Sequence, residues 1–234
     1  MKASFKKHTL NFKRPSGTSR GILTQKETWF VILEEDGKWG LGECGLLQGL
    51  SVDDRPDFEA KLEWVCQNSN RGLDFLLKEL VEFPSIQFGL EQAFLSLKND
   101  DRMILFPSEF TEGKASIPIN GLVWMGNKAF MKEQVEEKLN QGFRCIKLKI
   151  GAIDFEEELL LLKYIRSNFT SEDIEIRVDA NGAFTPSEAL EKLKKLADFQ
   201  LHSIEQPIKP GQWEEMAHLC DKSPLPIALD EELI

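Results

Sequence analysis

The chain has 234 residues, of which 41% are hydrophobic and 29% are charged, a composition typical of a soluble globular protein. Its net charge of −10 argues against nucleic acid as the main partner, because binding phosphates requires a basic surface. No stretch is long and apolar enough to span a bilayer, and the first residues lack a signal-peptide run, so we expect a cytoplasmic protein with no membrane partner. The four cysteines show no metal-binding spacing and are expected to be reduced thiols.

Residues up to about 112 are predicted to form an antiparallel meander followed by helices. The expected extended segments are residues 3–12, 27–34 and 38–43. A turn-rich loop is expected at residues 15–21, between the first two segments. Asp36 and Gly37 are expected at a hairpin turn. The expected helices are residues 56–68, 72–81 and 84–98. Strands followed by helices indicate a separate α+β domain, which we place at residues 1–112.

From about residue 113, predicted strands and helices alternate. The expected strands are residues 116–124, 145–151, 174–181, 202–205 and 226–230. The expected helices are residues 127–140, 154–169, 185–199 and 212–220, and the third begins with a capping box at Thr185. A strand–helix repeat of roughly 30 residues is typical of a (β/α)8 barrel. We therefore predict an α/β domain at residues 113–234 that holds the first five barrel strands.

Polar residues recur at the carboxyl ends of four of these strands. They are Lys147 and Lys149, Asp179, Glu205 and Asp230, with Asn181 in phase with Asp179. Side chains alternate between the two faces of a strand, so the apolar residues between them lie on the opposite face. Taken alone, the strand with Lys147 and Lys149 is better explained as a surface strand that places two lysines in water. Barrel chemistry occurs at the carboxyl ends of the strands, however, and the recurrence predicts one shared site.

Three carboxylates on neighbouring strands form an all-oxygen site suited to Mg²⁺, with Mn²⁺ as an alternative. No His or Cys lies at the equivalent strand ends, which disfavours Zn²⁺. Lys149 has a neighbouring cation in Lys147, and a bound metal would add another, so we expect a lowered pKa that makes Lys149 a base. Such a site suits removal of the proton α to a carboxylate, and the predicted partner is a small-molecule carboxylate substrate.

Several stretches resemble the enolase superfamily, in its muconate-cycloisomerase-like subgroup. They are residues 42–51, 119–126 and 229–233, the K-x-K motif at 147–149, the D-x-N motif at 179–181 and the E-Q-P motif at 205–207. The resemblance covers almost the whole chain. It implies an enolase-type capping domain at residues 1–112, followed at 113–234 by the first part of a modified (β/α)7β barrel. It also implies that the loops near 15–21 and 48–55 close over the substrate.

Within the subgroup, the sequence is most similar to the o-succinylbenzoate synthase family in its Bacteroidetes-like form. That resemblance implies a Mg²⁺-dependent syn dehydration that produces 2-succinylbenzoate for menaquinone biosynthesis. It implies that Lys149 is the acid–base lysine and that Lys147 helps to stabilise an enediolate. Asp179, Glu205 and Asp230 match the family's metal ligands, and a Lys base combined with Mg²⁺ is a pairing known for this superfamily.

The resemblance leaves alternatives open. Five strands do not close the barrel, so we expect a C-terminal truncation of a longer protein, and the family's second lysine and most specificity residues belong to later strands. The activity of the 234-residue chain itself and its oligomeric state therefore stay open. An N-succinylamino acid racemase, a dipeptide epimerase or a cycloisomerase is the first alternative. The second is an inactive fragment in which the lysines only form ion pairs with Asp179 and Glu205.

Overall fold

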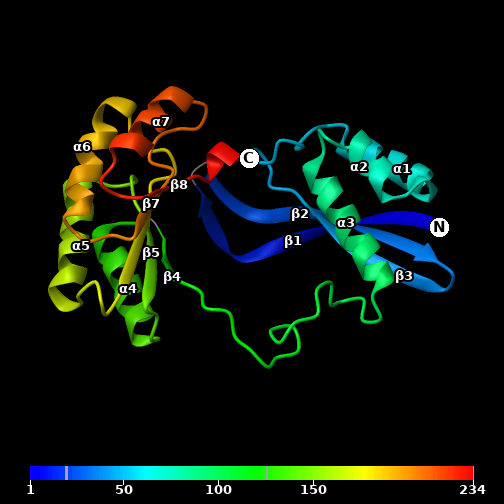
Figure 1. Ribbon diagram of the computed structural model, residues 1–234, viewed down its shortest axis with the longest axis horizontal. Helices are drawn as coiled ribbons and strands as arrows, with labels where there is room; N and C mark the ends of the chain where they lie inside the picture. Colours follow the sequence, from blue (N-terminus) through cyan, green and yellow to red (C-terminus); the bar gives the residue numbers. More distant parts are fainter. Residues whose placement is uncertain (19–20, 125, 234) are drawn as a thin grey trace. The chain divides into compact units, whose positions relative to one another are not determined.

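The structure is a computed structural model that describes residues 1–18, 21–124 and 126–233. The chain divides into two compact units, Met1–Ile117 and Pro118–Ile234, which are described separately below (Figure 1). The domain boundary predicted after residue 112 stays a prediction. No helix in the described ranges combines the length and apolar character that crossing a membrane requires.

The first unit contains a three-stranded antiparallel sheet. Its strands follow chain order and are β1 (Lys2–Thr18), β2 (Gly21–Glu35) and β3 (Lys38–Gly45). Asp36 and Gly37 connect β2 to β3 with φ angles of 51° and 75°, as a tight hairpin turn requires. The predicted meander and its hairpin turn are therefore confirmed.

The turn-rich loop predicted at residues 15–21 is wrong over most of its length. β1 continues to Thr18 and β2 begins at Gly21, with Ser16 paired to Leu23 after an irregularity in register. Pairing with the neighbouring strand satisfies the backbone groups of this segment, which overrides the local turn preference of its Pro, Ser and Gly residues. Residues 19–20 lie outside the described part of the chain.

Helices cover the sheet of the first unit, where Figure 1 shows α3 lying across the strands. The helices are α1 (Phe58–Asn68), the short η1 (Ser69–Arg71), α2 (Leu73–Glu79) and α3 (Pro84–Lys98). α3 approaches β3 so closely that a Cβ on Gly42 would overlap the backbone carbonyl of Gly89. Glycine at both positions therefore allows helix and strand backbones to touch.

The second unit contains a parallel five-stranded sheet in chain order. Its strands are β4 (Gly121–Val123), β5 (Cys145–Lys149), β6 (Glu175–Asp179), β7 (Ser203–Glu205) and β8 (Ile227–Ala228). The predicted strand order is confirmed. β4 is shorter than the strand expected at residues 116–124, because only three of its residues pair with β5.

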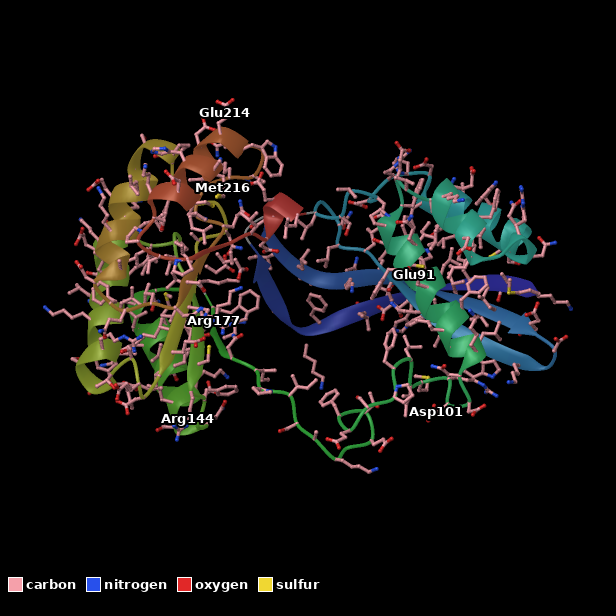
Figure 2. All side chains as sticks on the ribbon, viewed as in Figure 1. Glu91, Asp101, Arg144, Arg177, Glu214 and Met216 are labelled. Carbon is pink, nitrogen blue, oxygen red and sulfur yellow. The ribbon has the colours of Figure 1, made fainter. Side chains whose placement is uncertain are left out.

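Within the described part of this unit, four helices alternate with the strands, and α5 and α6 run along one face of the sheet (Figure 1). They are α4 (Lys128–Asn140), α5 (Phe155–Asn168), α6 (Pro186–Ala197) and α7 (Trp213–Lys222), and a short η2 (Glu231–Leu233) follows β8. The capping box predicted at Thr185 is present, with Glu188 as its reciprocal partner. On α7, Met216 is buried whereas Glu214 points outward (Figure 2).

The core of the second unit lies on one face of the sheet, between the strands and the helices. Ile146 and Leu148 of β5, Val178 of β6 and Ile204 of β7 are at most 1% exposed and pack with apolar residues of the helices. Because side chains alternate along a strand, burying these residues directs the polar residues between them to the opposite face. That face carries the lysines and carboxylates that the sequence singled out.

Candidate active site

Parallel pairing brings the polar residues of three strands into one row. Lys149 of β5 is in register with Asp179 of β6, and Asp179 is in register with Glu205 of β7. Neighbouring strands lie about 4.8 Å apart, so side chains in register on one face are within contact distance. Residues separated by 30 and 26 positions in the sequence therefore become direct neighbours.

Lys147 lies between two carboxylates. Its Nζ is 2.6 Å from each carboxylate oxygen of Glu205 and 3.2 Å from Oδ2 of Asp179. The Asp179 side chain is only 1% exposed, and that of Glu205 is 24% exposed, so water screens the attraction weakly. The ion pairs of Lys147 that the sequence offered under its second alternative are thus present.

Among the described residues, Lys149 makes two side-chain hydrogen bonds, one to β6 and one to the loop that follows it. Its Nζ donates to Oδ2 of Asp179 at 2.9 Å and to Oδ1 of Asn181 at 2.8 Å. The centroid of the Trp124 ring lies 5.9 Å from Nζ. The side chain of Lys149 is 17% exposed, so the amine is held in a fixed position yet remains accessible.

Burial and charge compete in setting the pKa values at this site. Burial raises the pKa of Asp179, but hydrogen bonding and charge from Lys149, together with the charge of Lys147, outweigh it and hold that pKa below its usual value. Burial lowers the pKa of Lys147, but Glu205 and Asp179 raise it above its usual value. The pKa of Glu205 is raised by burial and by the charges of Asp179 and Asp230, which prevail over Lys147.

Asp230 occupies a different position from the other two carboxylates. It follows β8, two residues beyond the Ala228 that pairs with Glu205, and its backbone N–H donates to Oε1 of Gln206 at 3.1 Å. Within the described residues, the carboxylates of Asp179, Glu205 and Asp230 do not form a closed ligand cluster. The assignment of these three as metal ligands therefore stays a prediction.

The donor atoms at these strand ends fit a hard divalent cation. Asp179, Glu205 and Asp230 offer only carboxylate oxygens, which Mg²⁺ prefers. The Lys147 ammonium already lies between Asp179 and Glu205, so these carboxylates hold a positive charge between them. Three carboxylates and the two ammonium groups of Lys147 and Lys149 leave an excess of one negative charge at these strand ends, which a bound cation would neutralise. The pKa of Glu205 is raised first by burial and then by the charges of Asp179 and Asp230.

Two features of the site carry more weight than the sequence indicated. Asn181 has a left-handed backbone with φ of 43°, and its side chain also donates to Oε1 of Glu231 at 3.1 Å, so it links Lys149 to the segment after β8. Gln206 lies in the E-Q-P motif, from which no role was predicted for it, although its side chain contacts the residues that follow β8. Its place directly after Glu205 was the one signal available in the sequence.

Glu158 is a buried carboxylate near the site for which the sequence predicted no role. It lies in the first turns of α5, is 2% exposed, and its Oε1 accepts from the backbone N–H of Gly151 at 2.6 Å. It therefore anchors the loop that begins directly after Lys149. Burial raises the pKa of Glu158 to about 7, against the opposing effect of the Gly151, Ile153 and Ala152 amides.

Comparison with known proteins gives one consistent family. A family profile described as "Enolase C-terminal domain-like" matches residues 130–234. The chain is 47% identical to an o-succinylbenzoate synthase of Desulfotalea psychrophila over 265 aligned residues, which cover 100% of this chain and 72% of that relative. It is 25% identical to a hydrophobic dipeptide epimerase of a Flavobacteria bacterium, across 99% of this chain and 68% of the relative.

Solved structures agree with this result. The crystal structure of MenC from Desulfotalea psychrophila has a TM-score of 0.87 at 42% identity and covers 100% of this chain and 72% of its own. An o-succinylbenzoate synthase from Thermosynechococcus elongatus, solved with Mg in its active site, has a TM-score of 0.80 at 23% identity, covers 99% of this chain and 69% of its own, and supports the fold. The predicted fold class, a capping domain followed by part of a barrel, is confirmed.

Proposed function

Because the chain belongs to the enolase superfamily, we propose that it catalyses the o-succinylbenzoate synthase reaction, a syn dehydration. The substrate is 2-succinyl-6-hydroxy-2,4-cyclohexadiene-1-carboxylate, and loss of water makes its ring aromatic as 2-succinylbenzoate. The 47% identity to a named o-succinylbenzoate synthase over the whole chain supports this reaction. The observation that best supports the reaction is the position of Lys149 at the strand ends, where its amine can act as the base.

Lys149 removes the proton at the ring carbon next to the carboxylate. A neutral lysine amine has two N–H groups, and the structure offers two acceptors for them, Oδ2 of Asp179 and Oδ1 of Asn181. When both bonds are kept, the lone pair of Nζ is directed away from these acceptors and is free to accept the proton. The same ammonium then gives that proton to the departing hydroxyl group on the same face, which releases water.

Lys147 contributes positive charge beside the developing negative charge on the substrate carboxylate. Asp179, Glu205 and Asp230 are the residues we propose to hold a divalent cation, Mg²⁺ or, as an alternative, Mn²⁺. When bound, that cation supplies further electrostatic stabilisation of the same negative charge. For Asp179 and Glu205 to hold it, Lys147 has to swing away from the position that its ammonium occupies between them.

An epimerase is the second candidate, because a dipeptide epimerase aligns over 99% of the chain. Epimerisation requires one base on each face of the substrate carbon. By resemblance, the second base would lie on a later barrel strand, so the five strands described here do not decide between the two reactions. We favour the dehydration, in which one lysine performs both proton transfers, because the chain is 47% identical to the synthase and 25% identical to the epimerase.

The test is ultraviolet detection of 2-succinylbenzoate formed from the cyclohexadiene substrate. The reaction is run with Mg²⁺, with EDTA, and with EDTA followed by excess Mg²⁺. We expect turnover with Mg²⁺, its loss on chelation and its recovery on adding the metal back. No turnover by folded, Mg²⁺-saturated protein, combined with racemisation of N-succinylamino acids or epimerisation of dipeptides, would replace dehydration with the second candidate.

A further inference from the structure

Gln206 lies directly after Glu205, and its side chain uses its full hydrogen-bonding capacity. Oε1 accepts from the backbone N–H groups of Asp230 at 3.1 Å and Glu232 at 3.2 Å. Nε2 donates to the carbonyl of Ile208 at 2.9 Å and to Oε2 of Glu232 at 3.1 Å. The residue is fully buried, so each of these four bonds replaces water that cannot reach the amide.

The backbone of Gln206 ties together three strand ends. Its N–H donates to the carbonyl of Ala228, the last residue of β8. Its carbonyl accepts from the N–H of Gly182, beyond β6, at 2.7 Å. Its φ angle of 39° is left-handed, a region that a residue with a Cβ rarely adopts. The surrounding hydrogen bonds hold this disfavoured conformation in place, as is common at functional sites.

Asp230 depends on this side chain for its attachment to the sheet. The ladder between β7 and β8 ends at the pairing of Glu205 with Ala228, two residues before Asp230. The carbonyl of Asp230 accepts from Leu233, which lies in the same turn of chain. Among the hydrogen bonds of the described residues, the bond from its N–H to Gln206 is therefore the one that joins Asp230 to the strand carrying Glu205.

We propose that Gln206 is a positioning residue that holds Asp230 beside Glu205 before any cation arrives, and thereby sets the affinity of the carboxylate site for a divalent cation. The inference rests on the proposed function for the identity of that site. Preorganised ligands bind more tightly because the ordering cost is met in folding and not in binding. An amide is required at position 206, because Ile208 and Glu232 both present acceptors to its Nε2.

Two variants of similar size separate the parts of this role. Gln206→Met removes all four side-chain bonds and keeps the length of the side chain. Gln206→Glu keeps an acceptor for Asp230 and Glu232 but turns the donor into an oxygen facing the Glu232 carboxylate. Leu196→Ala is the control, because it opens a cavity at a fully buried position near the end of α6 and removes none of the four hydrogen bonds of Gln206.

The first readout needs neither a cation nor activity. Hydrogen–deuterium exchange of residues 226–233 is measured by mass spectrometry in metal-free protein. We expect the amides of Asp230 and Glu232 to exchange at least 100-fold more slowly in the unaltered protein than in an unstructured peptide. Gln206→Met should speed their exchange at least tenfold, while Leu196→Ala should leave it unchanged at temperatures well below unfolding.

The second readout is the dissociation constant for Mg²⁺, measured by titration calorimetry. We expect the dissociation constant to rise at least tenfold in Gln206→Met and Gln206→Glu. In Leu196→Ala it should change less than twofold, even if this variant loses as much thermal stability as the Gln206 variants. Unprotected amides in the unaltered, metal-free protein would overturn the inference even if neither variant folds. An unchanged dissociation constant in folded Gln206 variants, or no Mg²⁺ binding by the unaltered protein, would also overturn it.

These readouts are independent of the dehydration assay. If the unaltered protein binds Mg²⁺ but does not form 2-succinylbenzoate, the proposed reaction fails while exchange and affinity still decide the role of Gln206. If the unaltered protein is active and the Gln206 variants bind Mg²⁺ normally, the reaction stands and the positioning role fails.

Discussion

Lys147 and Glu205 form a two-oxygen ion pair across three strands, with Nζ of the lysine 2.6 Å from each carboxylate oxygen. Lys147 is on β5 and Glu205 on β7, so the lysine reaches over β6, where it also lies 3.2 Å from Oδ2 of Asp179. One ammonium group thus lies within ion-pair distance of two carboxylates that we propose as cation ligands. This competition between a lysine and a metal for the same oxygens has measurable consequences.

Replacing Lys147 with methionine should expose that competition. The change leaves Glu205 without its cationic partner, and we expect the metal-free protein to lose about 2 kcal/mol of unfolding free energy. Mg²⁺ should raise the melting temperature of the variant more than that of the unaltered protein, because no lysine then competes with the metal for the oxygens of Glu205. Lys194→Met, which removes an exposed pair with Glu191, is the control and should cost about 0.5 kcal/mol or less. Equal Mg²⁺ responses in all three proteins would contradict the competition.

Lys149→Arg should separate the proposed base from the ion pair. Arginine keeps a positive charge beside Asp179 but does not release its proton near neutral pH, so it cannot act as the base. We expect turnover to fall on the order of 1,000-fold, with the unfolding free energy changed by less than about 1 kcal/mol. Steady-state kinetics and urea denaturation measure the two effects. Substantial activity in the arginine variant would rule out Lys149 as the proton acceptor.

Asn181 should contribute through both its side chain and its backbone. Asn181→Gly removes the bonds to Lys149 and Glu231, whereas Asn181→Ala also places a Cβ of an ordinary residue at φ of 43°. We expect both variants to lose about tenfold in turnover, since Lys149 loses one of its acceptors. The alanine variant should be less stable than the glycine variant by about 1 kcal/mol in urea denaturation. Alanine as stable as glycine would show that the left-handed backbone relaxes.

Glu158 should make stability depend on pH. Its pKa of about 7 in the folded protein exceeds the ordinary value of 4.5, so the folded state binds the proton more tightly than the unfolded state. Its stabilising contribution is therefore fully present below about pH 4.5 and is lost as the pH rises through about 7. Glu158→Gln should remove this decline while keeping an acceptor for Gly151. Between pH 5 and pH 8, the unaltered protein should therefore lose about 2 kcal/mol more unfolding free energy than the variant.

Urea denaturation at pH 5 and pH 8 measures this difference. Glu157→Gln is the matched control, because Glu157 is a neighbour on α5 that pairs with Lys128 at 2.8 Å and is 44% exposed. The control should keep the pH dependence of the unaltered protein. If both variants show the same slope between pH 5 and pH 8, the proton responsible belongs to another group.

Gly42→Ala should destabilise the first unit severely. A Cβ at this position would meet the backbone of α3 at Gly89 and Ala93, and backbone atoms cannot turn aside as a flexible side chain can. We expect a loss of about 3 kcal/mol from this overpacking. Gly45→Ala on the same strand is the control, since its nearest neighbour is the flexible Lys26 amine at 3.4 Å. Denaturation followed by circular dichroism should show the larger loss for Gly42→Ala.

The sequence by itself determined which residues share a face and where the helices of the second unit begin. Alternation along a strand depends only on backbone geometry, so Leu148 and Val178 could be assigned to the buried face and Lys149 and Asp179 to the other. The capping box at Thr185 is equally local, because its two hydrogen bonds span three residues. Family membership followed from motifs at these same positions and agrees with the comparisons.

Only the tertiary structure decided how those residues meet. The bridge of Lys147 between Asp179 and Glu205 and the contacts around the left-handed backbones of Asn181 and Gln206 all join segments far apart in the chain. The continuation of β1 to Thr18 has the same origin, because pairing with β2 overrode a local preference for turns. Local geometry repeats along a sequence and can be read there, whereas hydrogen bonds between distant residues exist only once the chain has folded.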